Sequence, residues 1–131
     1  VRVLMQRNLQ GDWVQGIPVV RQSRHDPVAN SARGAEVISG LDALDAETLL
    51  NIRQLIDDLG HAIDQIDGSE WALEAGVDLV LDQSHTPWLI EINSRPRGRM
   101  EVLADHDPAR FQQNHLDACC RPIERLHALI E

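Results

Sequence analysis

The sequence predicts an α+β fold in which an antiparallel β-sheet is covered by helices. Three observations carry this prediction. Residues 1–8 and 13–22 form one pair of β-rich runs, residues 77–82 and 88–93 form a second, and each pair is joined by a short polar segment. Between the two pairs, apolar residues recur every three or four positions, which is typical of a helix with one apolar face.

The N-terminal half is predicted to contain a hairpin, a loop and a helix. Turn-forming residues at 9–12 join the two strands of the hairpin, and residues 22–40, rich in Ser, Asn, Asp, Pro and Gly, are expected to form a long loop. Asp45 is suited to cap the helix, and Gly68 is expected to end it. Gly60 marks either a close packing contact or a break. The apolar stripe of this helix consists of Leu49, Ile52, Ile56, Leu59, Ile63 and Ile66.

Length and composition bound the possible functions. A chain of 131 residues with a net charge of −9 is expected to form one domain without a nucleic-acid partner. It contains no lysine, which excludes a Walker-type phosphate loop and a Schiff-base cofactor. No apolar run approaches the roughly 20 residues needed to cross a membrane. Cys119 and Cys120 favour a reducing, cytoplasmic location, and the apolar run that begins at Val1 is expected of a chain cut from a larger protein.

The C-terminal half contains the pattern that indicates chemistry. Matching apolar side chains on both faces of the second strand pair predicts one register, with Val77 opposite Ile92, Leu79 opposite Ile90, Val80 opposite Leu89 and Leu81 opposite Trp88. That register places Asp78 directly across from Glu91. Two carboxylates at this spacing repel each other unless a proton or cation lies between them.

From residue 108 onward a helix is predicted, and Pro122 is expected to start a second one.

A hard divalent cation fits the predicted carboxylate pair. Asn93 adds a neutral oxygen on the same strand face, and three oxygen ligands suit Mg²⁺ or Mn²⁺, with phosphate and water completing the coordination shell. The alternative is a plain, solvent-exposed strand face. Val80 and Leu89, which are apolar and predicted to lie on this face, indicate that it is partly covered.

Residues 89–96, LIEINSRP, resemble the metal-binding end of ATP-grasp enzymes, and most of all the spore-coat-associated YheC/YheD type. Residues 2–8 with 11–13 resemble that family's arginine-led strand and turn, and residues 76–79 resemble its first metal strand. The resemblance covers nearly the whole chain in the same order. It implies the C-terminal part of an ATP-grasp domain, spanning residues 1–131, with the lysines and adenine-binding linker in an upstream part of the same protein.

The resemblance also implies roles for individual residues. The expected reaction is ATP-dependent activation of a small carboxylate as an acyl phosphate, followed by attack of an amine, with Mg²⁺ or Mn²⁺ bridging the ATP phosphates. Apart from the resemblance, the basic residues 95, 97 and 99 either steer an anionic substrate or balance nearby acidic residues, and Arg95 is preferred because it is nearest to the metal strand. The expected metal ligands are Asp78, Glu91 and Asn93, the expected catalytic residues are Arg2, Arg21 and Arg95, and the expected nucleotide contacts are Asn30, Gly34 and Arg21.

Several alternatives remain at this point. Residues 29–35 resemble a family segment rich in consecutive glycines but contain Gly34 alone, which favours a catalytically inactive, spore-coat-associated binding or structural protein with coat proteins as partners. Without the resemblance, the favoured interpretation of Arg2 and Arg21 is that they are solvated strand residues. His115 and Cys119, four positions apart, suggest zinc, although a thiol on a packing helix is the simpler interpretation.

Overall fold

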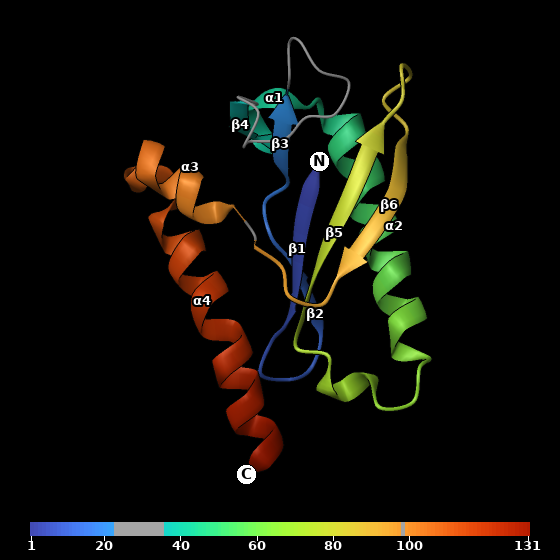
Figure 1. The fold of residues 1–131 in the computed structure, drawn as a ribbon, viewed down its shortest axis with the longest axis vertical. Helices are drawn as coiled ribbons and strands as arrows, with labels where there is room; N and C mark the ends of the chain where they lie inside the picture. The colour runs from blue at the N-terminus through green and yellow to red at the C-terminus, as the bar shows by residue number, and fades with distance from the viewer. Residues whose placement is uncertain (23–35, 98) are drawn as a thin grey trace.

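The computed structural model describes residues 1–22, 36–97 and 99–131. They form an antiparallel sheet with helices on both faces, which confirms the predicted α+β class (Figure 1). The strand order is β4-β3-β1-β5-β6, and β2 also pairs with β1. The elements are β1 (Arg2–Arg7), β2 (Trp13–Gln15), β3 (Val19–Gln22), β4 (Glu36–Ser39), α1 (Gly40–Ala43), α2 (Ala46–Asp64), a 3₁₀ turn (Ser69–Trp71), β5 (Glu74–Leu81), β6 (Pro87–Asn93), α3 (Met100–His106) and α4 (Pro108–Ile130).

The predicted N-terminal hairpin forms, but its second run is divided into β2 and β3. Both strands pair with β1, through Met5 opposite Gln15 and Arg2 opposite Val19. The division falls at residues 16–18, where Pro18 has no backbone N–H to donate to a ladder. The predicted loop 22–40 is wrong for residues 36–39, which form β4 and pair with β3.

The helix α2 begins as predicted. The Asp45 side chain accepts a hydrogen bond of 2.7 Å from the backbone N–H of Thr48. The helix ends at Asp64 rather than at Gly68, which lies four residues further on in the left-handed region at φ 81°. A Cβ atom at Gly60 would lie 2.9 Å from the Trp13 ring, so Gly60 marks a close packing contact and not a break.

The C-terminal helix α4 runs without interruption from Pro108 to Ile130. The predicted start of a second helix at Pro122 is therefore wrong. Pro122 has no N–H to donate to the Ala118 carbonyl one turn earlier, and the Gln6 side chain of β1 donates to that carbonyl instead, at 2.7 Å. Across the described residues, no helix combines the length and apolar character that crossing a lipid bilayer requires.

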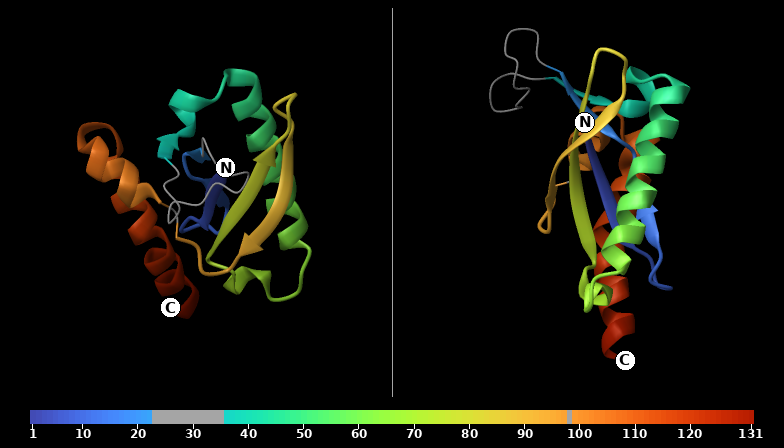
Figure 2. Two further views of the ribbon diagram at one scale, coloured as in Figure 1. Left: turned by 45° about the horizontal axis from the view of Figure 1, so that its top comes forward. Right: turned by 90° about the vertical axis from the view of Figure 1, so that its right-hand side faces the viewer.

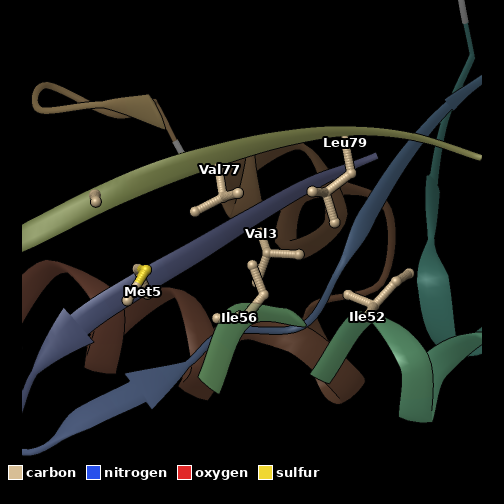
Figure 3. Packing of buried hydrophobic residues seen from close by; sticks show 7 residues of the cluster. Val3, Met5, Ile52, Ile56, Val77 and Leu79 are labelled. Atoms are coloured by element: carbon tan, nitrogen blue, oxygen red, sulfur yellow. The ribbon is translucent and has the colours of Figure 1, made fainter. Parts of the chain in front are cut away.

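The main apolar core lies between the sheet and α2. Val3 and Met5 of β1, Val77 of β5, and Ile52 and Ile56 of α2 are all less than 2% exposed and pack against one another (Figure 3). Since neighbouring side chains in a strand point to opposite faces, these contacts assign the residues between them to the face away from α2. The Gln6 side chain accordingly donates a hydrogen bond of 2.7 Å to the Ala118 carbonyl of α4.

Helices α3 and α4 pack near the opposite face of the sheet. Met100, Leu103 and Phe111 form a second buried cluster with Val19 of β3. Figures 1 and 2 show α2 and α4 on opposite sides of β1. The sheet face away from α2 is thus partly covered at one end and carries polar residues at the other.

The predicted register of β5 and β6 is confirmed at Val77 opposite Ile92 and at Asp78 opposite Glu91. Between Asp78 and Leu79 it shifts by one residue, so the three other predicted pairs are wrong. Leu89 and Ile90 are both apolar, and for that reason the pattern of apolar residues does not distinguish the two alignments. The bulge leaves one extra residue in β6 and re-aims the side chains beyond it. The observed pairs there are Leu79 with Leu89, Val80 with Trp88 and Leu81 with Pro87.

Candidate functional site

Three adjacent strands place charged side chains in one row on the sheet face away from α2. Asp78 lies in the middle strand, β5, between Val77 and Leu79, whose side chains are buried against α2. Arg2 of β1 is paired with Asp78 on one side, and Glu91 of β6 is paired with it on the other. Directly opposed residues share a face, so the pairing itself assembles this row.

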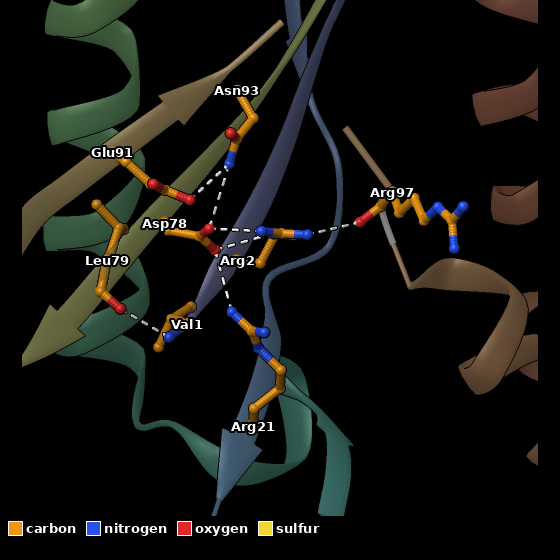
Figure 4. A network of polar contacts seen from close by, with 8 residues as sticks. All are labelled: Val1, Arg2, Arg21, Asp78, Leu79, Glu91, Asn93 and Arg97. Carbon is orange, nitrogen blue, oxygen red and sulfur yellow. Dashed lines mark hydrogen bonds and ion pairs between the residues drawn. The ribbon is translucent and has the colours of Figure 1, made fainter. Parts of the chain in front are cut away.

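Asp78 forms ion pairs with two arginines (Figure 4). Arg2 donates through Nε to Oδ1 at 2.9 Å and through Nη2 to Oδ2 at 2.5 Å. Arg21, which comes from β3, donates through Nη2 to Oδ1 at 3.3 Å. The two guanidinium groups therefore converge on one carboxylate that is 8% exposed.

Asn93 joins the two carboxylates of the row. Its side-chain amide donates to Oε1 of Glu91 at 2.9 Å and lies 3.5 Å from Oδ2 of Asp78. Both acidic groups thus lie within reach of one amide group, and Glu91, which is exposed, keeps oxygen atoms open to solvent. The name Asp78 cluster is used below for Arg2, Arg21, Asp78, Glu91 and Asn93.

The arginines decide the charge state of the cluster. Burial of Asp78 favours its neutral form, but the hydrogen bond and charge of Arg2 and the charge of Arg21 outweigh burial and hold the pKa of Asp78 below its usual value. In return, the hydrogen bond with Asp78 raises the pKa of Arg2 above its ordinary value. Asp78 is therefore an ionised carboxylate at neutral pH.

The segment after β6 crosses the sheet beside the Asp78 cluster. A Cβ atom at Gly76 would lie 2.6 Å from Cβ of Pro96, so Gly76 is needed for this close approach. The crossing brings the Arg97 carbonyl to Nη1 of Arg2, at 3.1 Å (Figure 4). In Figure 4 the Arg97 side chain points away from the cluster. The backbone of this segment, rather than its arginine side chains, contacts the cluster.

An exposed apolar patch adjoins the Asp78 cluster on the same face. Val80 and Trp88 face each other across β5 and β6 and are 49% and 58% exposed. The Trp88 indole N–H donates to Asp82 at 3.0 Å, which fixes the ring. The sequence analysis predicted that Trp88 lies on the other face of the sheet, because the predicted register of β5 and β6 did not include the bulge. It also expected Val80 and Leu89 to be partly covered on this face, whereas both are exposed and Leu89 pairs with Leu79 on the α2 face.

The predicted site residues are thus only partly brought together. The structure assembles five of them, the Asp78 cluster, from four strands. Arg95 is exposed, and within the described part of the chain no hydrogen bond or ion pair joins its side chain to that cluster. Asn30 and Gly34 lie outside the described residues.

The donor set of the Asp78 cluster fits a hard cation in its chemistry. Asp78, Glu91 and, after rotation of its amide, Asn93 offer oxygen atoms from adjacent positions, as Mg²⁺ prefers. The zinc interpretation gains no support. Cys119 and His115 approach to 4.0 Å, but no group of three or more His, Cys, Asp or Glu in the described ranges is placed to hold a metal, and both cysteines are free and exposed.

Comparison with known proteins agrees with this arrangement. The family model described as YheC/D like ATP-grasp matches residues 1–120, which include every strand and most of the described helices. No curated protein and no solved structure matches the chain. The match covers far more than half of the sequence, and ATP-grasp proteins share an ATP-binding, ligase-like fold. The chain therefore belongs to the YheC/D-like ATP-grasp family.

Proposed function

We propose that the Asp78 cluster binds the phosphates and metal of Mg·ATP in an ATP-dependent carboxylate–amine ligase. The observation that carries the proposal is the row of Arg2, Asp78 and Glu91 across β1, β5 and β6. Such a row presents a cationic group for phosphate oxygens next to carboxylates for a divalent cation. The exposed patch of Val80 and Trp88 beside the row suits a ligand that has an apolar ring as well as a polyanionic part.

The proposed roles follow from the chemistry of each side chain. Asp78, Glu91 and Asn93 hold Mg²⁺, which when bound neutralises phosphate charge and aligns the phosphates. Arg2 and Arg21 stabilise the charge that develops as the γ-phosphoryl group moves, because a guanidinium is a permanent, planar donor for oxyanions. Arg95, whose side chain is exposed, is proposed to attract the carboxylate substrate, and Asn30 and Gly34 to contact the nucleotide.

The proposed reaction has two steps. A carboxylate oxygen of the substrate attacks the γ-phosphorus of ATP, the bond to the β,γ-bridging oxygen breaks, and an acyl phosphate and ADP form. An amine then attacks the acyl carbon, inorganic phosphate leaves with the electron pair of the C–O bond, and the amine nitrogen loses a proton to give an amide. The protein supplies alignment and charge stabilisation in both steps.

Residues 1–131 are proposed to form the C-terminal part of the ATP-grasp domain. An upstream part of the same protein then supplies lysines and the adenine-binding linker, and the 131-residue chain by itself binds Mg·ATP weakly. The protein is proposed to act in the cytoplasm on small molecules. A spore-associated binding protein without catalysis is the alternative outcome of the test below.

The test is thermal unfolding of the full-length protein and of this chain with Mg·ATP. At about ten times its dissociation constant, a ligand stabilises the folded state by about 1.4 kcal/mol, or roughly 5 °C for the 131-residue chain. We expect Glu91→Gln to remove most of that shift. Glu124→Gln, which removes an equal charge from an exposed position in α4, is expected to leave it unchanged. If neither the wild-type protein nor the control responds to Mg·ATP, nucleotide binding is wrong and the binding-protein alternative is favoured.

A further inference from the structure

Both carboxylate oxygens of the proposed metal ligand Asp78 already accept hydrogen bonds from arginines. Its Oδ1 accepts from Nε of Arg2 and Nη2 of Arg21, and its Oδ2 accepts from Nη2 of Arg2 (Figure 4). A carboxylate has about four lone-pair sites; three of them accept from the two arginines, and the Asn93 amide lies 3.5 Å from Oδ2. A divalent cation that coordinates Asp78 must displace at least one of these hydrogen bonds.

Electrostatics oppose a cation at Asp78 while the arginines stay in place. The side chains of Arg2 and Arg21 are 13% and 19% exposed, so water screens their charges only in part. Two guanidinium groups within a few ångströms would repel a divalent cation strongly. By contrast, Glu91 is exposed and is contacted by the neutral Asn93 amide. The cluster in this arrangement offers a cation one carboxylate at most.

Arg21 also has a donor that Asp78 does not use. Its Nε atom is buried and, within the described part of the chain, has no hydrogen-bond partner. An unpaired buried donor on a charged group is unfavourable and is satisfied when an anion arrives. Phosphate oxygens are suited to this, because they accept from two N–H groups of one guanidinium at once.

We propose that Arg2 and Arg21 are exchangeable counter-ions of Asp78, and that Asp78 accepts a divalent cation only when an anionic ligand takes over these arginines. The inference rests on the proposed function, because the anion in question is the polyphosphate of the nucleotide. It adds that metal and polyphosphate bind with positive coupling, each raising the affinity for the other by the same factor. Without the anion, a free metal ion binds the site weakly, because Glu91 is the one carboxylate left to it.

The experiment measures Mn²⁺ binding to the 131-residue chain by electron paramagnetic resonance, at neutral pH and without nucleotide. We expect Arg21→Gln to bind Mn²⁺ about tenfold more tightly than the wild type, because one of the two opposing charges is gone. Arg53→Gln is the matched control. It removes the same charge from an exposed position on α2, on the other face of the sheet, and is expected to leave Mn²⁺ affinity unchanged.

A second substitution separates this effect from a general change in charge. In the Arg21→Gln background, Asp78→Asn is expected to abolish the gain, since the gained affinity depends on the freed carboxylate. Arg2→Gln is a further variant with the same expectation, and unchanged thermal unfolding and circular dichroism identify the variants that remain folded. Equal Mn²⁺ affinity in folded Arg21→Gln, folded Arg2→Gln and wild type would overturn the inference.

The two proposals fail in different ways. If wild-type protein binds Mn·ATP but the arginine variants bind free Mn²⁺ no better than wild type, the ion pairs are permanent structural contacts and only the counter-ion inference is wrong. If Arg21→Gln gains Mn²⁺ affinity but neither the chain nor the full-length protein binds Mn·ATP, the exchange of cations at Asp78 stands, while the proposed nucleotide function and the coupling to polyphosphate fail.

Discussion

Replacing Gly76 by alanine tests how the segment after β6 is held against the sheet. The added Cβ atom would lie 2.6 Å from Cβ and 3.4 Å from Cα of Pro96, so either the backbone of this segment or that of β5 must move. Proline cannot relieve the clash by a change of rotamer. Overpacking of this kind typically costs 1–3 kcal/mol, and we expect Gly76→Ala to destabilise the fold by about 2 kcal/mol in urea unfolding.

A double-mutant cycle assigns that cost to the contact. Pro96→Gly removes the clashing Cβ atom, and Gly76→Ala should then cost less than about 1 kcal/mol in this background. Gly68→Ala provides the control, since a Cβ atom at Gly68 meets nothing within 4 Å and its cost comes from φ 81° instead. If Gly76→Ala lowers the free energy of unfolding equally with and without Pro96, the cost does not come from a clash between these two residues, and the explanation is refuted.

Three further substitutions test separate contacts. Asp78→Asn should destabilise the chain at pH 7 by leaving two arginines without a counter-ion. Because the pKa of Asp78 in the folded chain lies below its ordinary value of 3.8, the loss of stability relative to wild type should be complete above about pH 4 and disappear as the pH falls through the folded pKa, as measured by urea unfolding at several pH values. Asp45→Ala removes the cap on the Thr48 N–H and should cost about 1 kcal/mol in the same assay, with no cost indicating that the cap is unimportant. Ile56→Ala should cost roughly 2–5 kcal/mol, because this side chain is 1% exposed in the main core, and a cost below 1 kcal/mol would contradict that packing.

Local patterns were sufficient to predict the parts of the fold that depend on nearby residues. The α2 helix follows from its apolar stripe and from Asp45, which caps it as expected. The pairing of Asp78 with Glu91 follows from the alternation of apolar residues around them, although the bulge beside this pair leaves no trace in the sequence. With Leu89 and Ile90 both apolar, a slip of one residue keeps apolar side chains opposite each other, so the pattern of apolar residues does not decide between the two alignments.

The part of the site that escaped prediction depends on contacts between distant strands. The resemblance implied that Arg2 and Arg21 face the phosphates. In the structure both side chains donate to Asp78, which lies 76 residues from Arg2 and 57 residues from Arg21 in the sequence. No local pattern reports such a pairing. The strand β4 was missed for a related reason, since four residues in a polar stretch become a strand only by pairing with β3.

The most direct test of the central claim is paramagnetic broadening of backbone amide signals by Mn²⁺ in the presence of ATP. We predict that amides of Asp78, Glu91 and Asn93 broaden first, and that Asp78→Asn combined with Glu91→Gln removes the effect. Broadening centred instead on the exposed carboxylates of α2, such as Asp57 and Asp58, or broadening that survives the double substitution, would contradict a metal site shared by β5 and β6.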